Sequence, residues 1–130
     1  MLIIKVEHQG KLISIIIKNS YSEDGITFVT PNNFSQQLAY MKHPAGKLID
    51  PHLHNPVERQ VLFIKRGKLK VNFFDDQKNF IESHILEEGD AILLASGGHG
   101  FEVLEEIEMF EVKQGPYLGE HDKTRFKHEK

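Results

Sequence analysis

Three histidines have the types and the spacing needed to bind a transition metal. His52 and His54 are separated by one residue, and His99 follows 45 residues after His54. On a β-strand, side chains two residues apart point to the same face, so the first two imidazoles would lie side by side. If His99 joins them from a second strand, three nitrogens would hold a metal and leave coordination positions open for a ligand.

The composition limits both the partners and the possible metal ligands. The chain has 130 residues, of which 39% are hydrophobic and 27% charged, as in an ordinary soluble globular domain. Its formal net charge of −3 lacks the basic excess of nucleic-acid-binding proteins, so we expect no nucleic-acid partner. Cysteine is absent, which excludes disulfides, thiolate metal ligands and a cysteine nucleophile. Any metal would therefore be held by histidine, carboxylate or amide oxygen.

The hydropathy of the chain predicts the cellular location of the protein. Residues 1–7 lack a basic region followed by a long apolar stretch, so no secretory signal is expected. No apolar run approaches the roughly 20 residues that a membrane-spanning helix needs. We therefore expect a cytoplasmic protein with no membrane partner.

Short β-rich runs separated by turn signals dominate the chain, and helical periodicity is scarce. Ten short strands at regular spacing predict an all-β fold, a sandwich or barrel of the jelly-roll type, in a single domain over residues 1–130. A short helix at residues 33–37 is a weakly supported addition. The predicted strands cover residues 2–6, 12–17, 26–30, 38–43, 60–65, 69–74, 80–87, 91–95, 101–104 and 107–113.

The last of these strands changes its hydrophobic phase. Ile107 and Met109 alternate with glutamates, but Phe110 and Val112 are the apolar residues of the second half. A β-bulge between Met109 and Phe110 would turn both halves towards one core. A strand that is buried on both faces near this point would explain the pattern equally well.

Two motifs resemble those of cupin proteins. The first cupin motif opens with a glycine, five residues and His-x-His, and Gly46 followed by His52 and His54 matches it. The second ends in Pro-x-Gly, two residues and a histidine. The run from Gly89 to His99 matches it, with an alanine in place of the proline and the histidine one residue early. The resemblance covers about residues 46–104. It implies a double-stranded β-helix (jelly-roll) barrel that holds a divalent transition metal, for which nickel, zinc, iron, copper and manganese are all candidates.

The resemblance leaves the fourth ligand open between two residues. In cupins six residues separate the glutamate from the following glycine, and leaving six residues before Gly67 leads to Gln60, whereas leaving three residues after His54 leads to Glu58. We favour Gln60, because it opens the apolar run of residues 61–64 and shares the register of that strand. A neutral amide would leave the metal charge uncompensated and make the metal a stronger Lewis acid. Glu58 would then face the substrate as a general acid or base.

Two further side chains are candidates for contact with a substrate. A barrel-facing Tyr40 would supply a hydroxyl that donates to the substrate or acts as an acid, although a structural strand tyrosine is the simpler interpretation. Arg59 lies between Glu58 and Gln60 and would attract a carboxylate or phosphate on the substrate.

These residues predict a metal-binding protein that acts on, or binds, a small oxygenated molecule. Residues 52–67, 115–119 and 123–126 also resemble small bacterial cupins with sugar and cell-surface polysaccharide functions, which implies a carbohydrate or sugar-acid ligand. The expected chemistry is isomerisation or proton transfer on the metal as Lewis acid. Iron-dependent dioxygenation and a non-enzymatic sugar-binding or sensor module are the alternatives. A homodimer is expected, because strand-forming termini such as residues 2–6 often pair at their edges.

Overall fold

Strands make up the regular structure of the described part of the chain, residues 2–54, 59–115 and 123–126 of a computed structural model. No segment in these ranges is a helix with the length and hydropathy to cross a membrane. Because the regular elements of these ranges are strands, the predicted all-β class is confirmed. The strands are β1 (Ile3–His8), β2 (Lys11–Ile17), β3 (Gly25–Phe28), β4 (Gln36–His43), β5 (Leu48–His54), β6 (Gln60–Phe74), β7 (Phe80–Glu87), β8 (Ala91–Leu94), β9 (Gly98–Gln114) and β10 (Lys123–Arg125).

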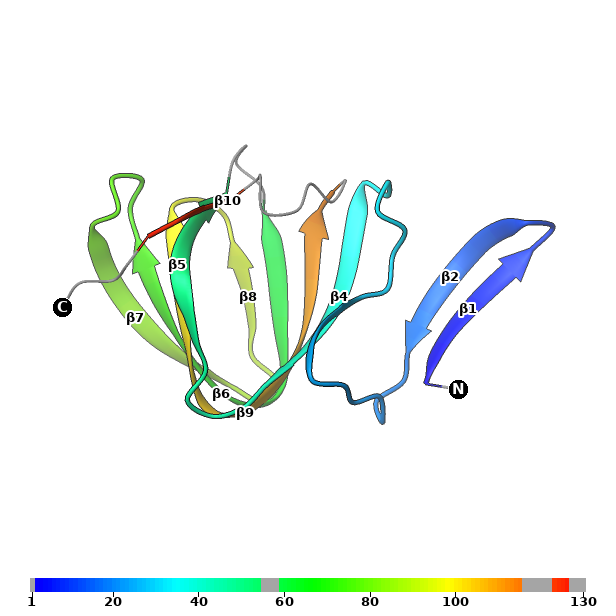
Figure 1. Ribbon diagram of the computed structural model, residues 1–130, viewed down its shortest axis with the longest axis horizontal. Helices are drawn as coiled ribbons and strands as arrows, with labels where there is room; N and C mark the ends of the chain where they lie inside the picture. The colour runs from blue at the N-terminus through cyan, green and yellow to red at the C-terminus, as the bar shows by residue number, and fades with distance from the viewer. Residues whose placement is uncertain (1, 55–58, 116–122, 127–130) are drawn as a thin grey trace.

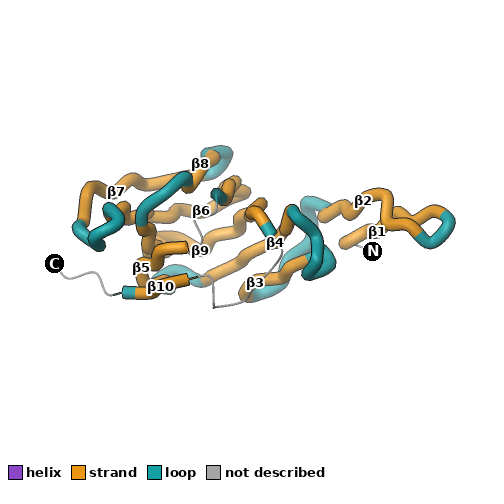
Figure 2. The backbone as a smooth tube through the Cα atoms, turned by 90° about the horizontal axis from the view of Figure 1, so that it is seen from above, coloured by secondary structure: helices purple, strands orange, loops and turns teal. Residues whose placement is uncertain are grey.

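Strand β9 is the centre of the main sheet. It pairs antiparallel with β4, β5 and β6, in the order β10-β5-β9-β4-β3, and β6 also pairs with β7 and β8. Both β6 and β9 bend at the bottom of the molecule, and their two halves rise as opposite walls (Figure 1). Seen from above, β7 and β8 lie on one side, with β3 and β10 on the other (Figure 2). This is the predicted jelly-roll architecture.

Two pairs of predicted strands are in fact single long strands. The turn signal at Arg66-Gly67 predicted a break, but the β6–β9 ladder continues through it with register shifts between Ile64 and Leu69. Gly67 has φ +98°, and a Cβ there would lie 2.1 Å from the carbonyl oxygen of Glu106. Because no other residue tolerates this conformation and this close approach, glycine lets the strand bend without leaving the sheet.

The core lies between the two walls, and β9 lines it along most of its length. Its buried members come from the alternating positions of β4, β6, β8 and β9, which is the period-two pattern that the sequence predicted. They are Met41, Leu62, Ile64, Leu69, Val71, Leu94, Phe101, Val103, Ile107 and Met109.

The end of β9 decides between the two explanations of its changed hydrophobic phase. Its pairing with β4 runs without a register shift from Ile107 to Gln114, so the proposed bulge is absent. Glu108 has the opposite parity to Ile107 and Met109, yet it is only 2% exposed. The strand is therefore buried on both faces near this point, as the second explanation required.

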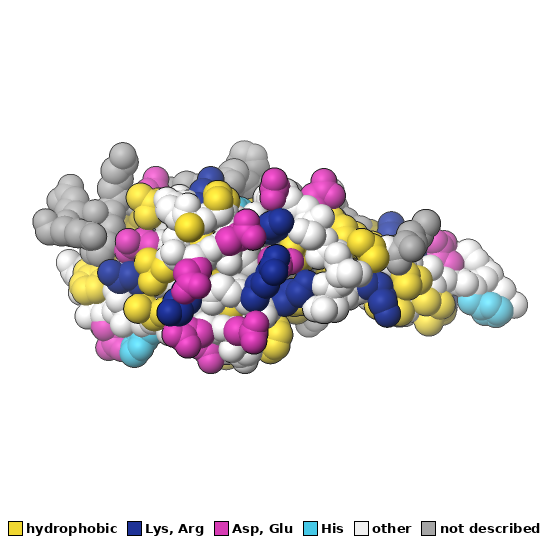
Figure 3. Space-filling model, turned by 90° about the horizontal axis from the view of Figure 1, so that it is seen from below, with side chains coloured by type: hydrophobic (Ala, Val, Ile, Leu, Met, Phe, Trp, Pro, Cys, Tyr) yellow, Lys and Arg dark blue, Asp and Glu magenta, His cyan; other side chains and the backbone are white. Residues whose placement is uncertain are grey.

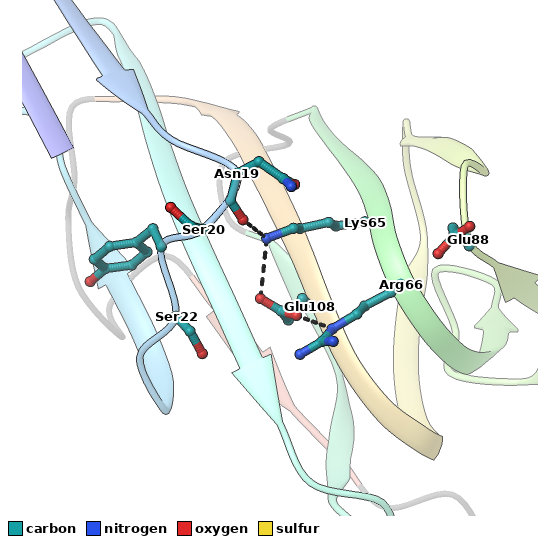
Figure 4. A pocket seen from close by; sticks show the side chains of 8 residues that line it. Asn19, Ser20, Ser22, Lys65, Arg66, Glu88 and Glu108 are labelled. Carbon is teal, nitrogen blue, oxygen red and sulfur yellow. Dashed lines mark hydrogen bonds and ion pairs between the residues drawn. The ribbon is translucent and has the colours of Figure 1, made fainter. Parts of the chain in front are cut away.

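Tyr40 and Glu108 lie on the outer face of the sheet, beneath the segment that joins β2 to β3. The Tyr40 hydroxyl donates to Glu108 Oε1. Lys65 and Arg66 form ion pairs with the same carboxylate (Figure 4). Lys65 Nζ also donates to the backbone oxygen of Asn19. We call Tyr40, Lys65, Arg66 and Glu108 the outer clasp, because they fasten the segment before β3 to the sheet.

A polar pocket of about 410 Å³ lies at the outer clasp. Its walls include Ser20, Ser22 and Glu88 besides Lys65, Arg66 and Glu108 of the clasp (Figure 4). Lys42 strengthens the attachment of the covering segment, since its Nζ donates to Ser22 Oγ at 3.0 Å. Edge-to-face packing of Tyr21 on Tyr40, with ring centroids 4.9 Å apart, completes the cover.

Some sequence expectations about secondary structure are wrong. Residues 33–37 do not form the helix considered above, since Gln36 and Gln37 already belong to β4. The list of predicted strands omits β5, although the spacing of His52 and His54 suited a strand. The omission arose because Asp50 and Pro51 are poor strand formers. Strand β10 was missed because its three residues lie in a charged tail.

The hairpin of β1 and β2 stands apart from the barrel. These strands pair only with each other among the described strands, as a separate two-stranded sheet. The hairpin projects from the body beyond β4 (Figures 1 and 2). We refer to it as the arm.

Replacing Gly67 by alanine should destabilise the protein strongly. The Cβ would combine a disfavoured backbone conformation, which costs about 1–3 kcal/mol, with a clash against Glu106. Gly89→Ala is the matched control, because Gly89 has φ +87° but nothing within 4 Å of the added carbon. Denaturant unfolding should show a larger loss for Gly67→Ala, and equal losses would contradict a packing role for this glycine.

Removing the Tyr40 hydroxyl should destabilise the protein at neutral pH more than at acid pH. Burial opposes ionisation of Glu108, but the Tyr40 hydrogen bond and the charges of Lys65 and Arg66 outweigh it and lower the carboxyl pKa. This stability is therefore present above the unfolded pKa of about 4.3 and is lost as pH falls through the folded pKa.

The Tyr40→Phe variant should lose about 1.5–3 kcal/mol of unfolding free energy at pH 7, because it removes a hydrogen bond to a buried charge. The difference from the wild type should narrow below pH 4. Tyr21→Phe is the control, since its hydroxyl makes only a 3.4 Å contact with Thr27. A pH-independent difference for Tyr40→Phe would show that Glu108 does not carry the effect.

Candidate functional site

His52 and His99 face each other inside the barrel. They are register partners on β5 and β9, their ring centroids are 4.6 Å apart at 70°, and they are 5% and 3% exposed. His99 has the same parity as the core residues Phe101 and Val103. The structure thus brings together two of the three histidines that the sequence proposed, from two separate strands.

A local irregularity in β5 turns His52 inward. Ile49 pairs with Phe101 and His52 with His99, so β5 has one residue more than β9 in this interval. The extra residue is absorbed at Asp50-Pro51, where proline suits a bulge. A Cβ at Gly100 would lie 2.8 Å from Pro51 Cγ, so glycine in β9 makes room for it.

The His52 ring is oriented for metal binding. Its Nδ1 lies 3.2 Å from the backbone oxygen of Asp50. A carbonyl oxygen can only accept, so Nδ1 carries the proton and Nε2 of the neutral ring keeps its lone pair. A ring held in this way through its second nitrogen is the usual arrangement of a metal-binding histidine.

Two of the predicted site residues cannot be placed. His54 ends β5 and its backbone pairs with Lys123, but its side chain lies outside the described part of the chain. Glu58 lies wholly outside it. Within the described residues, no group of three or more histidine and acidic side chains is close enough to hold a metal. The described side chains therefore include two of the three histidines proposed as ligands, His52 and His99.

Gln60 faces the interior, as its strand register predicted. It is 5% exposed and shares its parity with the fully buried Leu62 and Ile64. Gln60 Nε2 donates to Glu111 Oε2 at 2.7 Å. Gln60 Oε1 is buried and has no hydrogen-bond partner within the described residues. This amide oxygen therefore has an unused lone pair of the kind that a cation or a ligand hydroxyl would take.

Glu111 and Lys113 are interior residues that the sequence reasoning missed. They are 5% and 4% exposed and follow Ile107 and Met109 on the same face of β9. Lys113 Nζ lies 5.5 Å from the centroid of the Phe28 ring. A constant two-residue alternation along residues 107–113 would have placed both side chains on the inner face. Of the two explanations left open by the sequence, the bulge would have turned the apolar Phe110 and Val112 inward instead.

Tyr40 and Arg59 do not point into the barrel. The expected barrel-facing orientation of Tyr40 is wrong, because its neighbours Ala39 and Met41 take the inner face of β4. Burial and the hydrogen bond to Glu108 also raise the pKa of Tyr40 to about 12, so it is a poor proton donor. Arg59 is exposed, and its backbone N–H donates to Gln114 Oε1 at 2.8 Å. Its contact with a substrate stays a prediction.

No protein-family model and no curated protein matches this sequence. Solved structures do match the fold. Oxalate decarboxylase from Bacillus subtilis superposes with a TM-score of 0.64 at 21% identity, over 80% of this chain and 28% of that one. The chain thus spans less than a third of that protein.

Two other matches differ in size and activity. A cupin-2 domain protein from Shewanella frigidimarina has a TM-score of 0.56 at 15% identity, over 73% of this chain and 85% of that one. A salicylate 1,2-dioxygenase variant from Pseudoaminobacter salicylatoxidans, in complex with gentisate, has a TM-score of 0.53 at 17% identity. The match covers 63% of this chain and 21% of that one. With its jelly-roll strands and its inward-facing histidine pair, the chain has the cupin fold.

Proposed function

We propose that this protein is a metal-binding cupin that binds or converts a small oxygenated molecule. The observation that carries the proposal is the pair His52 and His99, buried side by side on neighbouring strands with their rings in edge contact. Two neutral imidazoles side by side supply nitrogen ligands of the kind that transition metals prefer.

The residues of the barrel suit a divalent transition metal. His52 and His99 would hold it together with His54, and Gln60 is the fourth candidate, with its unpartnered Oε1. A bound divalent cation would act as a Lewis acid on a carbonyl, hydroxyl or carboxylate oxygen. All four groups are neutral, so they would leave the positive charge of the metal available to the ligand.

Glu111 prepares Gln60 for this role. By accepting the hydrogen bond from Nε2, the carboxylate fixes the amide so that Oε1, and not the N–H group, is offered on its other side. Glu111 also brings a negative charge close to the proposed ligand set. The buried ammonium of Lys113 follows on the same face of β9, and we infer that it balances this carboxylate.

The proposed ligand class is a carbohydrate or sugar-acid derivative, and the proposed reaction is isomerisation or proton transfer. The resemblance to small sugar-related cupins supports this class. Fold relatives named for oxalate and solved with gentisate act on small oxygenated acids, which suits a mouth with cationic residues such as Arg59. Glu58 is proposed as the acid or base.

Dioxygenation and simple sugar binding are the competing functions. An enzyme should consume a sugar acid offered to the metal-loaded protein, whereas a binding module should show saturable thermal stabilisation without turnover. Iron specificity with oxygen uptake would favour the dioxygenase.

Elemental analysis of untagged protein should find near-stoichiometric divalent metal. The His52→Ala/His99→Ala variant should lose it, because two of the ligands are removed. The matched control is His8→Ala/His84→Ala, which removes two exposed histidines. If the wild type holds no metal even after incubation with Mn²⁺, Ni²⁺, Zn²⁺ and Fe²⁺, the metal-binding proposal fails and the sugar-binding module takes its place.

Replacing Gln60 by glutamate should make the protein more dependent on metal. The new carboxylate would lie beside Glu111, since the present amide nitrogen and Glu111 Oε2 are 2.7 Å apart. Two carboxylates so close repel unless a proton or cation lies between them. The metal-free variant should therefore melt at a lower temperature, and Mn²⁺ should stabilise it more than it stabilises the wild type.

A tenfold gain in affinity, worth about 1.4 kcal/mol, should raise the Tm by roughly 4 °C. The double variant Gln60→Glu/Glu111→Gln is the control, since it exchanges the two groups and should remove the metal-free penalty. Equal Mn²⁺ shifts in the wild type and Gln60→Glu would show that position 60 does not face the cation.

A further inference from the structure

The outer face of the barrel wall carries two rows of apolar side chains. The register places Leu38, Val112, Val61 and Leu93 in one row across β4, β9, β6 and β8. Phe110 and Phe63 lie in the next row, beside Tyr40. The outer face of an antiparallel sheet is normally polar.

These side chains are open to solvent in the single chain. Val61 is 40% exposed, Phe63 45% and Leu93 58%. Apolar residues that adjoin each other in this way mark a surface that another molecule covers. We call the two rows the outer apolar face.

The arm is the second apolar surface without a cover. Leu2, Val6, Ile13 and Ile16 are between 41% and 56% exposed on it. Hydrophobic side chains gather along the part of the arm that adjoins the body (Figure 3). An isolated two-stranded hairpin is marginally stable in water, so this one needs packing that the described part of its own chain does not supply.

A groove separates these two surfaces. It has a volume of about 520 Å³, with Ile13 and Ile15 of the arm on one side and Phe34, Leu38 and Val112 of the body on the other. Its lining is mostly apolar side chains. A projecting apolar arm and an apolar groove of similar chemistry therefore lie next to each other on one chain.

The root of the arm is fastened in its projecting position. Lys65 Nζ donates to the backbone oxygen of Asn19, two residues after β2 ends at Ile17, and Lys65 is itself paired with the buried Glu108 (Figure 4). The backbone N–H of Lys18 donates to the oxygen of Leu2 at 2.8 Å. The outer clasp thus fixes the position of the arm, so that its apolar side chains are available to a partner.

We propose that a second copy of this chain covers both surfaces. In a two-fold dimer the arm of each copy lies in the groove and across the outer apolar face of the other, so that one symmetric contact buries the exposed apolar groups of both surfaces. A second copy is the occupant that the observations favour, because the chain itself carries both complementary halves in adjacent positions. The inference goes beyond the proposed function and does not depend on the metal site.

Sedimentation velocity of the full chain at micromolar concentration should give twice the chain mass of 15.0 kDa. Ile13→Asp should give the monomer mass, because it places a charge in the proposed contact. Ile81→Asp is the matched control and should stay dimeric. Ile13 and Ile81 are both 56% exposed, but Ile81 lies on β7, which pairs only with β6 among the described strands.

Leu93→Asp, on the outer apolar face, should also give a monomer with an unchanged circular dichroism spectrum. A monomeric wild type would overturn the proposal, as would a dimer that Ile81→Asp breaks while Ile13→Asp and Leu93→Asp leave it intact. Metal content, measured on the same samples, should be equal in all variants. Loss of the dimer and loss of the metal site are thereby distinguished.

Discussion

The structure depends on the two-residue alternation of β9 on either side of its bend. His99, Phe101 and Val103 face the barrel interior before the bend, whereas Glu105 at the bend is exposed. After the bend the inward side chains are those of Ile107, Met109, Glu111 and Lys113. Because β9 pairs with β4, β5 and β6, its alternation decides which residues of those strands face inward. The apolar parts of the strand hold the barrel together, and its polar ends place His99, Glu111 and Lys113 on the same inner surface.

The strands that accompany β9 adjust to it by changing their own alternation. From Ile64 to Leu69, β6 advances by five residues while β9 advances by six between Met109 and Val103, so the inward positions of β6 change from even to odd. Gly67 permits this at the bend, where Glu106 lies too close for any side chain. At β5 the same adjustment is made at Asp50-Pro51, and it brings His52 opposite His99. The candidate site therefore depends on the irregularities of β5 and β6, which adjust the alternation of these strands to that of β9.

The same alternation links the interior to the outer surface. If Glu111 and Lys113 face inward, Phe110 and Val112 must face outward, where they form the apolar rows that we assign to a partner. Burying two charged residues is costly unless each is compensated, and Glu111 is hydrogen-bonded to Gln60. Polar groups inside and apolar groups outside are the reverse of what stability alone favours. This reversal supports the binding roles that we propose for both surfaces.

The sequence by itself determined the all-β class, most strand positions, the histidine pair and the inward position of Gln60. These depend on local period-two patterns and on motif spacing, which are properties of neighbouring residues. Only the tertiary structure decided that Tyr40 faces outward, that Glu111 and Lys113 face inward, and that β6 and β9 run through their predicted turns. Hydropathy assigns apolar residues to the inside, whereas the true facing of a residue is set by the strand with which it pairs. That partner lies far away in the sequence, and here it overrode the local pattern.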